Sequence, residues 1–354
     1  MKLIKTEDAV GHVLCHDITQ IIRGVTKDAV FRKGHVVQKE DIPVLLSVGK
    51  EHLYVWEKRE DMLHEDEAAL ILYEICVGNH MHAGEIKEGK IELIADCDGL
   101  FKVDSERLCA INMVGEMMIA TRHGNTTVHK GDKLAGTRVI PLIIEKKRIE
   151  QARSIAEEYK KNSGGLPMLD IKPFLHKKVG IVTTGSEVYY GRIEDTFTPV
   201  ILDKLAQFDT EIIGQKICND DPEGITAAIQ VWIEQGADLV ICTGGMSVDP
   251  DDRTPLAIKN ASSKSGKSQG GRVVSYGAPV LPGAMFLLAY HDDGVPIIGL
   301  PGCVMYARRT IFDLILPRLM ADERLTADDI NCLGEGGLCL SCEICTFPNC
   351  GFGK

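Results

Sequence analysis

Residues 239–254 read LVICTGGMSVDPDDRT, a short apolar and β-branched run that ends in two glycines and an acidic loop. Such a run predicts a buried parallel strand that delivers a polar loop to the carboxyl edge of a sheet, where open α/β folds bind ligands. Glycines let backbone amides approach an anion closely, and clustered carboxylates suit a hard cation such as Mg²⁺. Taken alone, the stretch is more typical of a strand followed by an Asx-rich turn. The candidate magnesium ligands are Asp249, Asp251 and Asp252.

The composition indicates a globular chain with a sizeable core. Its 354 residues are 44% hydrophobic and 26% charged, which is enough chain for two or three domains. A net charge of -11 without a basic stripe disfavours a nucleic-acid partner. Residues 1–8 lack an apolar signal core, and no apolar run reaches about 18 residues, so we expect no membrane segment and a cytoplasmic location. In the cytoplasm, we expect the twelve cysteines to be free thiols or metal ligands rather than to form disulfides.

The first part of the chain has a different rhythm from the rest. Residues 1–150 alternate short apolar runs with glycine turns, which predicts a β-rich N-terminal module with short helices. Residues 151–172 are predicted as a helical linker, because a charged helical run is broken by the glycines and proline of 162–167.

Residues 173–320 alternate strand and helix patterns. Strands are predicted at 179–184 and 211–218, and helices open at Thr198 and at Asp221, each followed by proline. Alternation at this spacing predicts an α/β fold of three layers, with a mostly parallel sheet covered on both faces. Because the strand ends of such a sheet share one edge, we expect the polar loops at 183–187, 243–252 and 297–302 to converge.

Four of these motifs carry a resemblance to a known family. TGSE (184–187), NDD (219–221), TGGMS (243–247) with Asp252, and LPG (300–302) resemble the successive motifs of the molybdopterin-binding domain. That domain is shared by molybdopterin adenylyltransferases, molybdopterin molybdenumtransferases and gephyrin. The resemblance covers residues 175–320, and the KGD turn at 130–132 resembles more loosely the β-rich part of the molybdenumtransferases.

The resemblance implies a role in late molybdenum cofactor assembly. The chain would bind molybdopterin or adenylyl-molybdopterin and, with Mg²⁺, promote insertion of molybdate. Functional carboxylates are implied at Glu187, Asp220 and Asp252, although Glu187 also suits a helix cap and either Asp220 or Asp221 suits an N-cap before Pro222. The implied pterin-phosphate residues are Thr184, Gly185, Ser186, Thr243, Gly244, Gly245, Ser247, Pro301 and Gly302.

Departures from the family pattern keep two other functions open. Asp249 stands where molybdenumtransferases usually have glycine, and Cys303-Val304 replaces the usual Asn-Pro. DDRT at 251–254 is similar to the competence-damage-inducible family, which implies a nucleotide hydrolase. A non-catalytic carrier that hands the cofactor to a molybdoenzyme is the other alternative, so an enzymatic role stays open. A homo-oligomer is implied only by the family.

Residues 321–354 are predicted as a cysteine-rich metal-binding tail. Cys339, Cys342, Cys345 and Cys350 have the spacing C-x2-C-x2-C-x4-C, and four thiolates so close in sequence can hold one Zn²⁺ or an iron–sulfur cluster. The first three cysteines have ferredoxin-like spacing, which favours iron–sulfur. A disordered thiol-rich tail is the alternative, and a redox or docking role beside a molybdoenzyme would fit.

Overall fold

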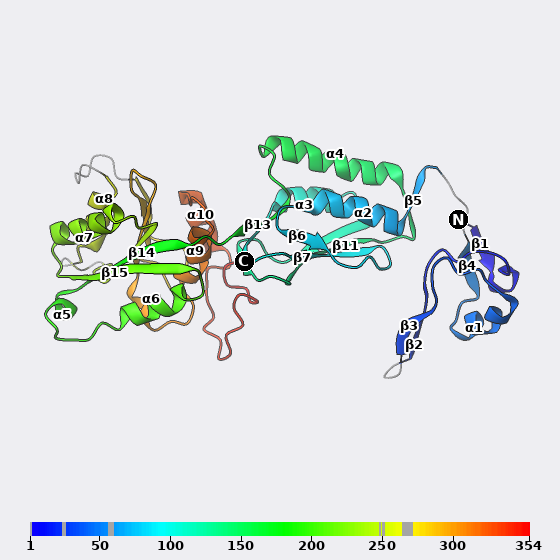
Figure 1. Ribbon diagram of the computed structural model, residues 1–354, viewed down its shortest axis with the longest axis horizontal. Helices are drawn as coiled ribbons and strands as arrows, with labels where there is room; N and C mark the ends of the chain where they lie inside the picture. Colours follow the sequence, from blue (N-terminus) through cyan, green and yellow to red (C-terminus); the bar gives the residue numbers. More distant parts are fainter. Residues whose placement is uncertain (1, 23–25, 56–59, 248, 250–251, 264–271) are drawn as a thin grey trace. The chain divides into compact units, whose positions relative to one another are not determined.

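The computed structural model describes residues 2–22, 26–55, 60–247, 249, 252–263 and 272–354 (Figure 1). They form two compact units. The first contains Met1–Cys97, Val103–Arg122 and Lys130–Ile171, and the second contains Asp98–Lys102, His123–His129 and Lys172–Lys354. No helix in these described ranges is long and apolar enough to span a bilayer.

The first unit begins with two small antiparallel pairs of strands. Strand β1 (Lys2–Lys5) pairs with β4 (His52–Val55), and β2 (Ile18–Ile22) pairs with β3 (Thr26–Phe31). Helix α1 (Ile42–Ser47) and two 3₁₀ turns, η1 (Thr6–Asp8) and η2 (Lys39–Asp41), complete this region. Apolar side chains from these elements form one core, of which Leu14, Ile18, Leu45 and Leu53 are fully buried.

The rest of the first unit is a four-stranded antiparallel sheet with helices. The order is β6 (Met81–Ala83), β7 (Lys90–Ala95), β11 (Lys133–Val139), β9 (Met117–Thr121). Helices α2 (Glu65–Cys76), α3 (Ser105–Asn112) and α4 (Lys146–Asn162) lie on one side of it (Figure 1). Outside this sheet, β5 (Met62–His64) pairs with β12 (Ile143–Glu145). The antiparallel pair of β8 (Gly99–Val103) and β10 (Thr126–Val128) lies mostly in the second unit.

Helix α4 occupies much of the region predicted as a linker. It buries Ile149, Ala152 and Ala156 at helical spacing and contacts α2 and α3. The residues therefore pack within the first unit, and the chain enters the second unit through β13 (Leu169–Pro173).

The second unit is built on a six-stranded, mostly parallel sheet, as predicted. Strands β15, β14, β16 and β19 are parallel neighbours in that order, and β18 and β17 extend the sheet antiparallel. Their bounds are β14 (Lys177–Thr184), β15 (Thr210–Cys218), β16 (Leu239–Thr243), β17 (Arg272–Tyr276), β18 (Leu287–Tyr290) and β19 (Pro296–Leu300).

Alternation along the central strands builds a core on each face of the sheet. Val179 and Ile181 of β14 pack with apolar residues of α6 (Phe197–Leu205) and α9 (Ile311–Met320). Val182 faces the other way, toward residues of α7 (Pro222–Glu234) and α8 (Thr254–Ala261). Figure 1 shows α7 and α8 on one side of β14 and β15, and α6 on the other. The three-layer α/β prediction is confirmed.

Helix α7 is held close to the sheet by Trp232. The indole Nε1 donates a hydrogen bond to the Ile181 carbonyl oxygen at 3.1 Å. A Cβ atom on Gly180 or Gly214 would lie 2.5 Å from the Trp232 side chain, so both strands need glycine beneath it.

The chain after β19 does not enter a long helix at once. A 3₁₀ turn, η3 (Gly302–Met305), comes first, and α9 begins only at Ile311, with a capping box between Thr310 and Asp313. Residues 302–309 therefore contain only this turn and irregular chain, and they border two cavities. Helix α10 (Ala327–Asn331) and η4 (Cys332–Gly334) follow α9.

Candidate functional site

A cavity of about 780 Å³ lies where β14, β15, β16 and β19 end. It is called the loop pocket here. The loops that follow these strands supply most of its lining, so the predicted convergence at the carboxyl edge takes place in the structure. Of the residues proposed from the sequence, the lining contains Thr184, Gly185, Ser186, Glu187, Asp220, Thr243, Gly244, Gly245, Asp249, Asp252 and Gly302.

The loop after β14 is fastened to the end of β15. Gly185 has a φ of 133°, which favours glycine, and leads into the short helix α5 (Ser186–Tyr189). The Ser186 amide donates to Asp220 Oδ2 at 2.9 Å. Asp221, by contrast, is the N-cap of α7 and accepts from the Gly224 amide at 2.9 Å. Asp220 therefore lines the loop pocket, whereas Asp221 caps α7.

The double glycine after β16 is required by the neighbouring strand end. Gly244 has a φ of 82°, and a Cβ atom there would lie 2.1 Å from the Thr184 carbonyl oxygen. Gly245 also has a positive φ, of 54°. The Thr184 and Thr254 hydroxyls lie 2.9 Å apart across this turn. Backbone amides can therefore approach a bound anion without interference from side chains.

Asp252 makes two hydrogen bonds to neighbouring residues. Its Oδ2 accepts from the Ser247 amide at 2.8 Å, and its own amide donates to the Asp249 carbonyl oxygen at 3.0 Å. Asp249 and Asp252 both line the loop pocket, whereas Asp251 lies outside the described residues. Ser247 and Pro301 are not among the lining residues. The Ser247 amide donates to Asp252, and Pro301 is the residue before η3.

Thr243 provides an independent sign of a ligand. Its side chain is fully buried, lines the loop pocket, and its Oγ1 has no hydrogen-bond partner in the part of the chain that the structure describes. A buried hydroxyl without a partner is costly, so a ligand oxygen or nitrogen within reach would stabilise it. Together with the glycine turns, this hydroxyl suits a ligand that presents oxygen atoms, such as a phosphate group.

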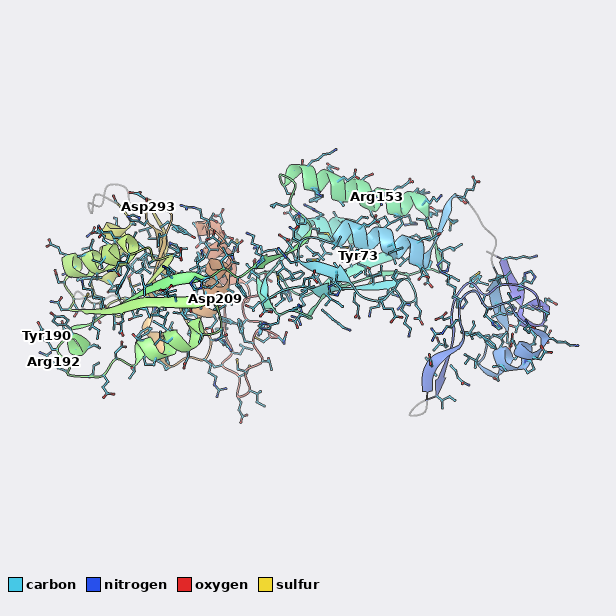
Figure 2. The ribbon with its side chains drawn as sticks, in the orientation of Figure 1. Tyr73, Arg153, Tyr190, Arg192, Asp209 and Asp293 are labelled. Atoms are coloured by element: carbon cyan, nitrogen blue, oxygen red, sulfur yellow. The ribbon has the colours of Figure 1, made fainter. Side chains whose placement is uncertain are left out.

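Two arginines that no sequence prediction assigned to the site also line the pocket. Arg192 and Arg253 line it, and the Arg192 guanidinium lies 5.3 Å from the centre of the Tyr190 ring. Figure 2 shows Tyr190 and Arg192 next to each other beyond α5. Both arginines are exposed and could contact a phosphate. Arg192 lies outside the recognised motifs, and Arg253 belongs to the DDRT motif but was not assigned to the site, so their position in the fold identifies them.

Asp195 is a further lining residue without a sequence prediction. Burial alone would raise the pKa of Asp195, but hydrogen bonds from the Thr198 hydroxyl and from the amides of Thr198 and Phe197 outweigh it and lower the pKa below its ordinary value. Gln215 Nε2 also donates to it at 2.6 Å. This carboxylate therefore holds the start of α6, and an aspartate two residues before a helix was the available signal.

The charges on the loop pocket favour a cation beside an anionic ligand. Its lining includes six carboxylates and two guanidinium groups. A bare phosphate would meet net repulsion, whereas a divalent cation between carboxylate and phosphate oxygens would remove it. The carboxylates are Glu187, Glu194, Asp195, Asp220, Asp249 and Asp252.

The cysteine-rich tail is folded rather than extended from the domain. All four of its motif cysteines line a second cavity, of about 700 Å³, which is called the tail cavity here. Hydrogen bonds from the Phe347 amide and the Arg309 side chain lower the pKa of Cys345. Across the described residues, no three His, Cys, Asp or Glu side chains are gathered tightly enough to hold a metal ion.

The fold and the loop pocket define a three-layer α/β domain with glycine-rich and acidic loops at the carboxyl edge of its sheet. Residues 180–321 match the family described as "Probable molybdopterin binding domain", and this segment of the chain belongs to that family. Residues 3–57 match a domain of unknown function, DUF8806.

Individual relatives resemble only part of the chain. A CinA-like protein of Mycobacterium tuberculosis is 40% identical over 77 residues, which are 22% of this chain and 18% of that protein. The match therefore spans about a fifth of that relative's length. The structure of MoaB, a molybdopterin biosynthesis enzyme of Thermus thermophilus, is similar with 22% identity and a TM-score of 0.32, covering 42% of this chain and 98% of MoaB. The Mog protein of Mycobacterium ulcerans has 19% identity and a TM-score of 0.32, with 40% and 91% covered.

Proposed function

We propose that the loop pocket binds molybdopterin or its adenylate together with Mg²⁺ and promotes the insertion of molybdate. The observation that carries the proposal is the meeting of Thr243, the glycine turns and the carboxylates in one cavity of about 780 Å³. The family of residues 180–321 supports a pterin as the ligand. Cavities of this size accommodate small-molecule cofactors.

The phosphate end of the ligand is assigned to the glycine turns. Gly185, Gly244 and Gly245 have positive φ values and leave the backbone accessible, and Thr243 Oγ1 offers a hydroxyl to the same ligand. Arg192 and Arg253 would neutralise part of the charge of a phosphate or an adenylate. These residues bind and orient the ligand.

The carboxylates are assigned to the cation and to molybdate handling. Asp220 and Asp252 each use one oxygen to hold a loop amide, which fixes the direction of the second oxygen. Mg²⁺ would supply Lewis-acid stabilisation of the phosphate oxygens during cleavage of the adenylate. Three more carboxylates complete the proposed acidic set. Asp249 and Glu187 are included because they line the pocket, and Asp251 is included because of the sequence pattern.

Two other functions predict different outcomes. A nucleotide hydrolase is favoured by the 77-residue match to a CinA-like protein, and it would bind a ribose nucleotide without binding pterin. A carrier that delivers cofactor to a molybdoenzyme would use the same pocket without turnover.

The deciding experiment is an anaerobic fluorescence titration of the full chain with molybdopterin and with its adenylate, followed by Mg²⁺ and molybdate. Tight binding and release of adenylate on adding molybdate are expected. Binding without release would identify a carrier. Absence of pterin binding, with a ribose nucleotide bound instead, would overturn both and leave the hydrolase.

A further inference from the structure

We infer that Cys339, Cys342, Cys345 and Cys350 ligate a [4Fe–4S]-type cluster in the tail cavity. The four cysteines fall within residues 339–350 and line the same cavity of about 700 Å³. Thiolates of four cysteines are the usual ligand set of such clusters. The inference is independent of what the loop pocket binds.

The tail is held in place before any metal binds. The Leu281 amide donates to the Gly337 carbonyl oxygen, and the Cys339 amide donates back to the Leu281 carbonyl oxygen, each at 2.8 Å. At the other end of the tail, the Gly353 amide donates to the Gly336 carbonyl oxygen at 2.9 Å. The segment 336–353 is therefore a closed loop, and its cysteines are not carried by a free tail.

Packing supports the same conclusion. Phe352 is 4% exposed and belongs to the core on the α9 side of the sheet, against which Cys339, Phe347 and Cys350 also pack. A Cβ atom on Gly353 would lie 2.4 Å from Leu314 Cδ2, so the tail approaches α9 closely. Because the loop is ordered by these contacts, cluster binding would cost less conformational entropy than in a disordered tail.

The side chains around the cysteines suit a cluster with net negative charge. Arg308 Nη1 donates to the Glu343 carbonyl oxygen at 2.8 Å, and the Arg309 guanidinium lies 4.8 Å from the centre of the Phe347 ring. Both arginines line the cavity, and the rest of its lining is mostly apolar. A core of iron and sulfide with four thiolates is anionic, so nearby guanidinium groups stabilise it, and an apolar shell limits access of water.

The spacing of the cysteines favours a cluster over a single zinc ion. Cys339, Cys342 and Cys345 follow one another as C-x2-C-x2-C, which is the spacing of three cluster ligands in ferredoxins.

The test is anaerobic reconstitution of the full chain with Fe²⁺ and sulfide, followed by iron, sulfide and zinc analysis and by absorption and electron paramagnetic resonance spectra. The matched variants are Cys342→Ala and Cys345→Ala, both at exposed positions, and the control is Cys332→Ala, an exposed cysteine outside the cavity lining. Thermal unfolding of each protein checks that the fold is retained.

We expect roughly four iron and four sulfide per wild-type chain. The same loading is expected in Cys332→Ala, and loss of most of the iron in the two cavity variants. Stoichiometric zinc that iron does not replace, iron without sulfide, or no bound metal would each overturn the inference. Equal loading of control and cavity variants would also overturn it. If a cavity variant unfolds, the stoichiometry and spectrum of the wild-type chain still decide the outcome.

Discussion

The loop pocket and the tail cavity have similar volumes, about 780 and 700 Å³, but opposite linings. Carboxylates, hydroxyls and accessible backbone line the first, whereas thiols, aromatic rings and aliphatic side chains line much of the second. Hard oxygen ligands suit Mg²⁺ and phosphate, and soft sulfur ligands suit iron–sulfur or zinc. The two cavities of one unit therefore select different chemistry.

They also differ in how the chain builds them. The loop pocket draws on residues from Thr183 to Met305, which only the folded sheet brings together. The motif cysteines of the tail cavity all come from residues 339–350. Damage to the sheet edge should therefore disable the loop pocket as a whole, while single changes in the tail should leave it intact.

The largest effect is expected for Gly244→Ala. The new Cβ atom would lie 2.1 Å from the Thr184 carbonyl oxygen at a φ of 82°, so the turn must move or remain strained. Strain of about 3 kcal/mol corresponds to roughly a 100-fold loss of pterin affinity. Fluorescence titration with molybdopterin measures this loss of affinity. The iron content of the tail should be unchanged.

Gly191→Ala is the control for this change. Gly191 has a φ of 67°, but a Cβ atom there would have no other atom within 4 Å, so alanine meets backbone strain without a collision. Similar losses of affinity in both variants would show that the close approach of Gly244 to Thr184 does not shape the site.

Asp252→Asn should separate turnover from binding. Asparagine can still accept from the Ser247 amide, so the loop is kept, but the negative charge offered to Mg²⁺ is lost. We expect a decrease of roughly 10–100-fold in Mg²⁺-dependent turnover, with pterin affinity nearly unchanged. Adenylate release is measured at several Mg²⁺ concentrations.

Asp221→Asn is the matched control, because Asp221 caps α7 and asparagine is an equally good N-cap. Equal turnover in Asp252→Asn and wild type would remove Asp252 from the proposed mechanism, and absence of turnover in both would favour the carrier.

A smaller effect is expected for Asp195→Asn, because this carboxylate holds the start of α6. The pKa of Asp195 is lowered in the folded state, so its contribution to stability is present above its ordinary pKa of 3.8 and is lost as the pH falls through the folded value. The variant should be about 1 kcal/mol less stable at pH 7, and the difference should shrink below pH 4.

Thermal unfolding at a series of pH values measures this difference. Asp203→Asn, at an exposed position on the same helix, is the control. A difference from wild type that stays constant down to pH 3 would show that the ionised carboxylate is not what stabilises the helix.

Much of the second unit was predictable because its signals are local and periodic. The run at 239–243 alternates between two cores, and Pro222 after Asp221 marks the start of α7, as expected. The resemblance to the molybdopterin-binding domain implied Thr184, Asp220 and Gly244 as site residues. The parallel strands explain why the loops that carry them meet at one edge.

The missed features depend on spatial neighbours. Arg192 belongs to no motif, and the DDRT motif does not show that Arg253 lines the pocket. Whether Asp220 or Asp221 faces the pocket depends on which amide each one accepts from. The sequence shows that the four tail cysteines are close along the chain. It does not show the hydrogen bonds that hold the tail in place, from Cys339 to Leu281 and from Gly353 to Gly336. The irregular segment 302–309 likewise has no helix-breaking pattern that sets its length.

The smallest effect is a coupling between the two cavities. Gly302 and Met305 line the loop pocket, and Tyr306, Arg308 and Arg309 line the tail cavity, so one short segment borders both. A cluster that orders this segment would reduce the entropy lost when pterin binds. We expect molybdopterin affinity to rise about threefold in the cluster-loaded chain, a weak coupling by usual standards.

The coupling must be reciprocal, because both ligands act on one binding equilibrium. Molybdopterin should therefore strengthen cluster retention during chelation by the same factor of about three. Cys342→Ala carried through the same reconstitution is the control, and its pterin affinity should equal that of the cluster-free wild type. Equal affinities in loaded and cluster-free chains would show that residues 302–309 separate the two cavities rather than connect them.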